Sequence, residues 1–263
     1  MGDRVAASPG RVAVRDAEPR DRAAPSPNAT IVAREDLTRS VARFVVRPDD
    51  GPIPFLPGQY LAVGLDLGGR FVQRPYSTAS PSGSRDLEFL VRLIAGGALT
   101  PSLWRLRPGE RVRLGRPKGI FTLLDNDPRT HVFSATGTGL APFISMIAAL
   151  ASRPTPPTSI VLHGVAHASE LAYRDRIHGW QDRRVQYIPV VSRPDAPGSP
   201  GWAGSTGRVD AALADLFDRS VIGARDTVIY ACGNPAMVAS VSRLATAAGA
   251  PADAVRSEQY WVP

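Results

Sequence analysis

The first half of the chain alternates short apolar segments with turn signals, a pattern typical of β-strands. Apolar, β-branched segments cover residues 41–46, 60–65, 87–94 and 111–114. Turn residues separate these segments at Asp50-Gly51, Gly68-Gly69, Gly96-Gly97 and Pro108-Gly109. Several short strands at this spacing predict a small antiparallel barrel, with one short helix over residues 100–106.

The pattern changes after residue 128, where strands and helices alternate. Predicted strands cover residues 131–136, 160–165, 185–191 and 227–232. Predicted helices cover residues 139–151, 169–180 and 209–217, and a last helix starts at Pro235 with Asn234 as its cap. This alternation predicts a doubly wound parallel sheet with helices on both faces. A ligand of such a sheet lies beyond the carboxyl ends of its strands.

Together the two patterns predict an α+β protein of two domains. The antiparallel barrel is expected over residues 29–126 and the α/β domain over residues 127–263. Residues 1–28 are rich in Ala, Pro and Arg without apolar periodicity, which predicts a disordered extension. A translation start placed too early is the alternative explanation for these residues.

Composition narrows the function classes. The only cysteine is Cys232, so the chain forms no internal disulfide and lacks the four thiolates of an iron–sulfur cluster. We expect no metal site. We also expect no nucleic-acid binding, because the arginines of the chain are scattered rather than interleaved with aromatics. The longest apolar run, residues 139–151, is too short to cross a bilayer. We therefore expect a cytoplasmic protein that is a monomer; the formal net charge of +7 favours an acidic partner.

A glycine loop follows the first strand of the second half and opens its helix. It reads Thr136-Gly137-Thr138-Gly139, with Pro142 in the first helical turn. Glycines let backbone N–H groups approach a ligand closely, and a helix N-terminus attracts phosphate. On spacing alone, a tight packing turn explains this loop as well as a phosphate site does.

Several short motifs occur in a fixed order along residues 35–261. They are Pro57-Gly58-Gln59-Tyr60, Arg74-Pro75-Tyr76-Ser77, Gly97-Ala98-Leu99-Thr100, Gly119-Ile120-Phe121-Thr122, the Thr136–Pro142 loop, Cys232-Gly233-Asn234-Pro235 and Tyr260-Trp261. Alone, Arg74 to Ser77 reads as a solvated loop between two barrel strands. The ordered set resembles the ferredoxin–NADP reductase family, and its aromatic ending resembles the bacterial ferredoxin and flavodoxin reductases.

The resemblance implies an FAD site. Arg74 would pair with the pyrophosphate, whose oxygens suit a planar guanidinium. Tyr76 and Tyr260 would stack on opposite faces of the isoalloxazine, and the Ser77 hydroxyl would lie near flavin N5. The further FAD contacts implied are Pro75, Val91, Arg92, Leu93, Ala98, Leu99, Thr100, Thr136 and Trp261. The chain continues with Val262-Pro263 beyond the tryptophan, a departure from the family pattern.

The resemblance also implies an NADP(H) site, with Cys232 near the nicotinamide ring. A 2′-phosphate needs cationic or hydrogen-bonding partners, and the family pattern places them at Ser192, Arg193 and Arg208. The remaining contacts implied are Gly137, Thr138, Gly139, Val165, Gly233 and Asn234. One departure concerns Ala166, which stands where NADP enzymes often carry arginine. We still predict NADPH over NADH.

The function implied is electron transfer between NADP(H) and a one-electron carrier, ferredoxin or flavodoxin. Hydride would pass between nicotinamide C4 and flavin N5, followed by single-electron steps, with Ser77, Cys232 and Tyr260 as the catalytic residues. Other hypotheses stay open. They are an NAD(P)H-dependent flavin or quinone reductase, the electron-transfer subunit of a larger enzyme, and a non-catalytic FAD-binding module.

Overall fold

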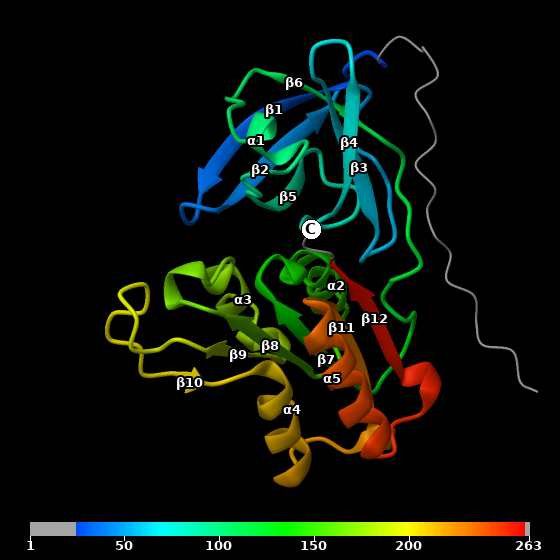
Figure 1. Cartoon of the computed structure of the whole chain (residues 1–263). Helices are drawn as coiled ribbons and strands as arrows, with labels where there is room; N and C mark the ends of the chain where they lie inside the picture. Colours follow the sequence, from blue (N-terminus) through cyan, green and yellow to red (C-terminus); the bar gives the residue numbers. More distant parts are fainter. Residues whose placement is uncertain (1–24, 261–263) are drawn as a thin grey trace, which may run out of the picture.

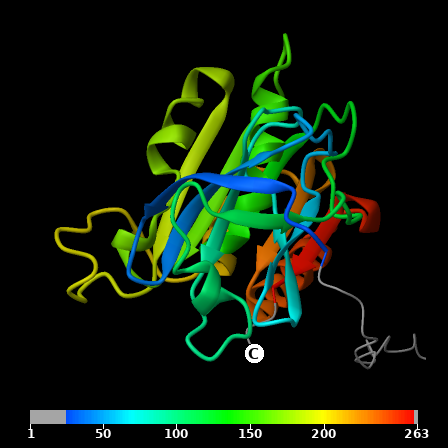
Figure 2. The same cartoon turned by 90° about the horizontal axis from the view of Figure 1, so that it is seen from above.

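The computed structural model describes residues 25–260, which form two domains stacked one on the other (Figure 1). The antiparallel strands lie above the parallel sheet, and Figure 2 shows the same overlap from above. Residues 1–24 of the extension predicted over 1–28, and the predicted FAD contact Trp261, lie outside the described residues. Asn28, the last residue of that range, is ordered, since its N–H donates to the Val112 carbonyl of the barrel at 3.1 Å. The two-domain fold class predicted from the sequence is confirmed.

The first domain is an antiparallel barrel of six strands in the order β4-β3-β6-β1-β2-β5. The strands are β1 (Ala29–Asp36), β2 (Val41–Pro48), β3 (Tyr60–Asp66), β4 (Phe71–Ser77), β5 (Leu87–Arg92) and β6 (Arg111–Leu114). A bridge between Thr78 and Phe89 joins the ends of β4 and β5, which closes the barrel. Alternate residues such as Ile31, Phe44 and Leu61 point inward and form one apolar core. The short helix is α1 (Thr100–Leu103).

The expectation of a loop over residues 74–77 is wrong. These residues belong to β4, where Arg74 is registered with Val63 and Tyr76 with Leu61 of β3. Pro75 lacks an N–H for the ladder and would disrupt a central strand. It is tolerated because β4 is the outer strand of the sheet.

The second domain is a six-stranded parallel sheet in the order β10-β9-β8-β7-β11-β12. Its strands are β7 (Thr130–Thr136), β8 (Ser159–Val165), β9 (Val185–Val191), β10 (Ser205–Thr206), β11 (Thr227–Gly233) and β12 (Val255–Gln259). Its helices are α2 (Ala141–Ala151), α3 (Arg174–His178), α4 (Val209–Asp218) and α5 (Pro235–Ala247). The strand order reverses between β7 and β11, where ligands of open sheets bind.

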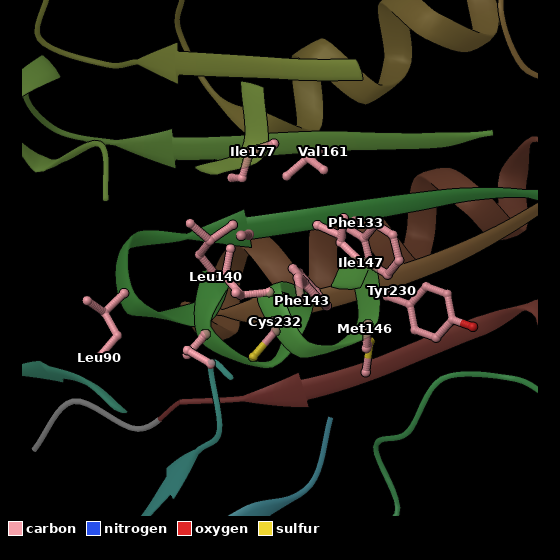
Figure 3. Packing of buried hydrophobic residues seen from close by; sticks show 14 of the residues in the cluster. Leu90, Phe133, Leu140, Phe143, Met146, Ile147, Val161, Ile177, Tyr230 and Cys232 are labelled. Carbon is pink, nitrogen blue, oxygen red and sulfur yellow. The ribbon is translucent and has the colours of Figure 1, made fainter. Parts of the chain in front are cut away.

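The helices cover both faces of this sheet, as predicted. The face with α2 and α3 packs Phe133, Phe143 and Tyr230 into one cluster (Figure 3). The other face packs α4 and α5 against Ile160 and Ile229. Buried side chains of this size contribute about 1.5–3 kcal/mol each, so both helical layers hold the sheet firmly.

The predicted helix over residues 169–180 is interrupted. The chain forms a single turn at Ala168–Glu170 and then α3 over Arg174–His178. Between them Tyr173 has a left-handed backbone, with φ of 58°. That conformation is costly for a residue with a side chain. This left-handed conformation is retained because the Tyr173 hydroxyl hydrogen-bonds Glu88 of the barrel. The tertiary contact thus overrides helix propensity.

Candidate functional site between the two domains

A cavity of about 1080 Å³ lies where the carboxyl ends of the parallel strands face the barrel. Its wall includes β4 and β5 of the barrel and the segments that follow β7, β8, β9 and β11. Its volume exceeds the range of ordinary small-molecule sites, about 300–1000 Å³. The cavity therefore has room for dinucleotides at the switch point of the sheet.

Most of the predicted FAD residues lie on this wall. They are Arg74, Pro75, Tyr76, Ser77, Arg92, Ala98, Leu99, Thr100, Thr136 and Tyr260. Arg74 is exposed and makes no ion pair with any other residue between 25 and 260; one nitrogen, Nη1, donates to its neighbour's carbonyl at 2.8 Å. A guanidinium with donors to spare on a cavity wall fits the pyrophosphate of a dinucleotide.

Tyr76 stands beside Arg74 on β4 with its ring half-buried against the barrel core. Burial raises the pKa of its phenol to about 12, although the nearby Arg74 cation acts in the opposite sense. The ring is therefore neutral at physiological pH and offers a flat apolar face. Tyr60 of β3, which belongs to the Pro57–Tyr60 motif but was assigned no cofactor contact, lies on the same wall.

Two of the predicted FAD contacts lie away from the wall. Val91 points into the barrel core, where 1% of its surface is exposed. The Leu93 N–H donates to the Ser40 carbonyl at 2.8 Å, so this donor is already used within the barrel. In this stretch the cavity wall is formed instead by Leu90, Arg92 and Ile94.

The glycine loop after β7 is packed against the end of β11. A Cβ on Gly139 would stand 2.3 Å from the Cys232 carbonyl oxygen, and one on Gly233 would stand 2.3 Å from the Thr136 hydroxyl. Thr136 in turn accepts a hydrogen bond from the Asn234 N–H at 2.8 Å. Gly139 thus serves this packing and lies off the wall, whereas Gly137, Thr138, Gly233 and Asn234 lie on it.

Buried His163 on β8 fixes the glycine loop from below. Its Nε2 lies 3.1 Å from the Gly137 carbonyl, which can only accept, so Nε2 carries the proton. Its Nδ1 then accepts from the Tyr187 hydroxyl at 3.0 Å. Burial lowers the pKa of His163 to about 4, which keeps the ring neutral at physiological pH. No sequence pattern indicates this contact, because it joins strands β8 and β9 to the loop after β7.

Of the residues predicted to contact the 2′-phosphate, two lie on the cavity wall and one lies off it. Ser192 and Arg208 lie on the cavity wall together with Val165, whereas Arg193 is exposed and lies off it. Asp210 joins them on the wall, with Arg208 Nε 3.7 Å from its carboxylate. A hydrogen bond from Ser240 is the largest influence that lowers the pKa of Asp210, so this group is charged at neutral pH.

Three predicted catalytic residues and one that the sequence missed meet at the junction of the domains. The Tyr260 hydroxyl lies 2.6 Å from the Ser77 hydroxyl, which lies 3.4 Å from the Glu258 carboxylate. Cys232 is fully buried in the cluster against which Tyr260 packs, while the Tyr260 N–H donates to the Gly233 carbonyl at 2.8 Å. Residues far apart in sequence, from β4, β11 and β12, are thereby brought together.

Burial sets the protonation states in this cluster. It raises the pKa of the Glu258 carboxyl to about 7, against a smaller opposite effect of the Ser77 hydrogen bond. Burial also raises the pKa of the Cys232 thiol well above its ordinary value, and the neighbouring Glu258 adds to this. The thiol is therefore neutral at physiological pH, whereas Glu258 exchanges a proton near neutrality.

Glu258 could have been noticed as the acid two positions before Tyr260, in a strand that the sequence pattern did not predict. Within residues 25–260, no group of three or more His, Cys, Asp or Glu side chains is arranged to hold a metal ion.

No helix in this same part of the chain is both long enough and apolar enough to cross a bilayer.

Comparisons with known proteins agree with this geometry. Residues 28–123 match the family described as oxidoreductase FAD-binding domain, and residues 133–243 match the oxidoreductase NAD-binding domain. The chain is 34% identical over 240 residues to ferredoxin–NADP reductase B of Sorangium cellulosum, covering 88% of this chain and 96% of the relative. It is 30% identical over 195 residues to the flavodoxin/ferredoxin–NADP reductase of Escherichia coli, covering 71% and 77%.

A solved ferredoxin NADP+ reductase from Neisseria gonorrhoeae, with bound FAD and NADP, shares the fold. Its TM-score is 0.76 at 23% identity, over 89% of this chain and 98% of that one. The two matched domains, with the relatives named ferredoxin–NADP reductase, confirm the expected cofactors, FAD and NADP(H). The chain belongs to the ferredoxin–NADP reductase family of FAD-dependent oxidoreductases, which transfer electrons between NADP(H) and a one-electron carrier.

Proposed function

We propose that this enzyme reduces a ferredoxin or a flavodoxin with electrons from NADPH. The observation that supports this most directly is the cluster of Ser77, Glu258, Tyr260 and Cys232 at the meeting point of the two domains. It joins the FAD side of the cavity to the nicotinamide side. Bound FAD supplies the chemistry there, accepting a hydride and releasing electrons one at a time.

On the FAD side, Arg74 binds the pyrophosphate and Tyr76 packs against the flat ring. The support for these roles is a cation without an acidic partner and a neutral aromatic face, both on strand β4. Because β4 is registered along its length with β3, the two side chains keep a fixed spacing. This arrangement orients the ring before any second substrate arrives.

On the nicotinamide side, the glycine loop receives the phosphates of the dinucleotide. The loop leads into α2, whose first turn carries no acidic residue, so its N-terminal dipole is free to attract an anion. His163 holds the Gly137 carbonyl and thereby directs the N–H groups of the loop toward the cavity. Arg208 and Ser192 contact the 2′-phosphate.

At the junction, Tyr260 would cover the flavin face that the nicotinamide must reach, so its ring would have to move aside for NADPH. Ser77 and Glu258 would lie near the reacting atoms, and Glu258 holds or releases a proton near neutral pH. Cys232 is fully buried, so it would meet the nicotinamide only after Tyr260 has moved; its thiol stays protonated, which suits packing rather than nucleophilic chemistry. The role of these residues is to orient the reacting rings and to exclude water.

Two observations favour a separate carrier protein as the acceptor. The chain holds one cysteine and so cannot build its own iron–sulfur cluster. The relative from Sorangium cellulosum, which the chain covers over 96% of its length, is named a ferredoxin–NADP reductase. The second candidate, a reductase of free flavins or quinones, needs the same cavity but no protein partner.

An acceptor panel separates the two candidates. The FAD-loaded enzyme is supplied with NADPH, and its rates with ferredoxins, flavodoxins, free flavin and a quinone are compared. We expect a carrier protein to be reduced at a higher kcat/KM than either small acceptor. Faster reduction of free flavin or quinone than of every carrier would contradict the proposal.

A further inference from the structure

Strand β5 presents a charged and apolar seam to the second domain. Alternate residues of a strand point to opposite faces. Leu87, Phe89 and Val91 fill the barrel core. Leu90, on the opposite face, is buried in the cluster around α2 of the parallel-sheet domain. Glu88 and Arg92 flank Leu90 on that same face.

Glu88 receives donors from both domains. Its carboxylate accepts two hydrogen bonds from Arg176 at 2.9 and 3.1 Å and one from the Tyr173 hydroxyl at 3.1 Å. Arg43 of the barrel donates at 3.3 Å. The Glu88 side chain is only 13% exposed. A bidentate guanidinium pair that is largely shielded from water is geometrically specific. We call these four residues the interdomain clamp.

A second pair of charges follows four residues further along β5. Arg92 Nη2 lies 3.5 Å from the carboxylate of Glu170. Glu170 belongs to the turn that precedes α3, so both pairs join β5 to the same segment, residues 168–176. The left-handed backbone at Tyr173 interrupts the helix and places its hydroxyl on Glu88.

The clamp lies between the segments that meet the two cofactors. Beyond β5 the barrel continues through Arg92 and Ile94 to Thr100 on the cavity wall. Strand β8, which precedes residues 168–176, ends at Val165. Val165 and the following Ala166 lie on the same wall. Hydride transfer needs reacting atoms about 3–3.5 Å apart, and a misplacement of about 1 Å can cost 100-fold in rate. Fixing β5 to the segment after β8 fixes that separation.

We propose that Glu88 is a positioning residue that holds the nucleotide-binding domain in the orientation required for hydride transfer between the two cofactors. The inference rests on the function proposed above and assigns Glu88 no contact with either cofactor. Replacing Glu88 by glutamine removes the negative charge and turns one of its two acceptor oxygens into an NH2 donor facing Arg176. The segment 168–176 therefore loosens while each cofactor still binds its own domain.

The test compares Glu88→Gln with Asp86→Asn in the FAD-loaded enzyme. Asp86 pairs with Arg47 at 2.7 and 2.9 Å, close to β5 but entirely within the barrel, which makes it a matched control. We expect Glu88→Gln to slow flavin reduction at saturating NADPH about tenfold. The dissociation constants of FAD and NADPH should change less than about twofold, and Asp86→Asn should match the wild type in every measurement.

Hydrogen–deuterium exchange gives a readout besides activity. In Glu88→Gln the amides of residues 168–178 should exchange faster, whereas those of β8 and β9 should not. Should Glu88→Gln fail to fold, Arg176→Met replaces it, and Arg176→Lys should recover part of the rate.

Wild-type reduction rates, equal losses in both carboxylate variants, or slower reduction without faster exchange would each overturn the proposal. A wild-type enzyme that NADPH does not reduce would instead refute the proposed function, while exchange would still report whether Glu88 holds the domains together.

Discussion

The FAD side of the cavity and its 2′-phosphate side are built differently. Arg74 to Ser77 lie on β4, where pairing with β3 fixes each position. Ser192 lies at an exposed strand end and Arg208 in an exposed turn. The Arg208 guanidinium lies beside the Asp210 carboxylate on the cavity wall. From this difference we expect FAD binding to depend on a rigid strand, and the choice between NADPH and NADH to depend on a few exposed charges.

The largest effect is expected on the rigid side, from Arg74→Ala. Loss of two charge-assisted hydrogen bonds to pyrophosphate should weaken FAD binding on the order of 100-fold. Quenching of flavin fluorescence on binding measures the affinity. Arg70→Ala, in the exposed turn before β4, is the control and should bind FAD normally. Equal affinities for both variants would remove Arg74 from the FAD site.

Glu258 provides a pH-dependent test at the junction. Burial raises its pKa from 4.5 to about 7, so the folded protein keeps a proton that the unfolded chain releases. Stability should therefore fall as pH rises from about 4.5 to 7, by about 2 kcal/mol after allowing for partial exposure.

Urea unfolding across this pH range measures the effect, and Glu258→Gln should lack the decrease. Glu110→Gln, which alters an exposed acid, should retain it. Parallel profiles for the wild type and Glu258→Gln would show that this carboxyl is not shifted.

On the exposed side, Arg208→Ala should raise the KM for NADPH about tenfold and leave the KM for NADH nearly unchanged. Arg193→Ala is the matched comparison, because Arg193 was predicted from the sequence for the same phosphate but lies off the cavity wall. Steady-state kinetics with both nucleotides decide between them. A larger effect from Arg193 would reverse the assignment.

The smallest effect is expected from Asp210→Asn. Removing a negative charge beside Arg208 should lower the KM for NADPH about threefold, since exposed charges interact weakly. Asp215→Asn, on the same helix and paired with Arg219, is the control. An unchanged or higher KM for NADPH in Asp210→Asn would show that this acid does not oppose the phosphate.

Local patterns predicted much of this fold. The β2 and β3 strands, four of the parallel strands (β7, β8, β9 and β11) and the Asn234 cap followed from period, turn chemistry and capping preference. The cap accepts from the Ala236 N–H at 2.9 Å. Strands β10 and β12 were not predicted. The break at Tyr173 could not be predicted, because its cause is a contact with Glu88, distant in sequence.

The site was predicted where a motif keeps its residues together and missed where separate strands supply them. Arg74, Tyr76 and Ser77 stand in one motif and lie together on the wall. His163 and Glu258 acquire their roles only through burial and neighbours from other strands. Arg193 is the opposite case: the sequence motif predicts a contact with the 2′-phosphate, but the residue lies outside the cavity.

We propose above all that one cavity brings the nicotinamide to a flavin bound between the barrel and the parallel sheet. Stopped-flow reduction of the FAD-loaded protein by NADPH carrying deuterium at the transferred C4 position tests it most directly. We predict a yellow protein that bleaches on mixing, more slowly with deuterium than with hydrogen. A protein that takes up no FAD, or one that stays oxidised in the presence of NADPH, would contradict the account.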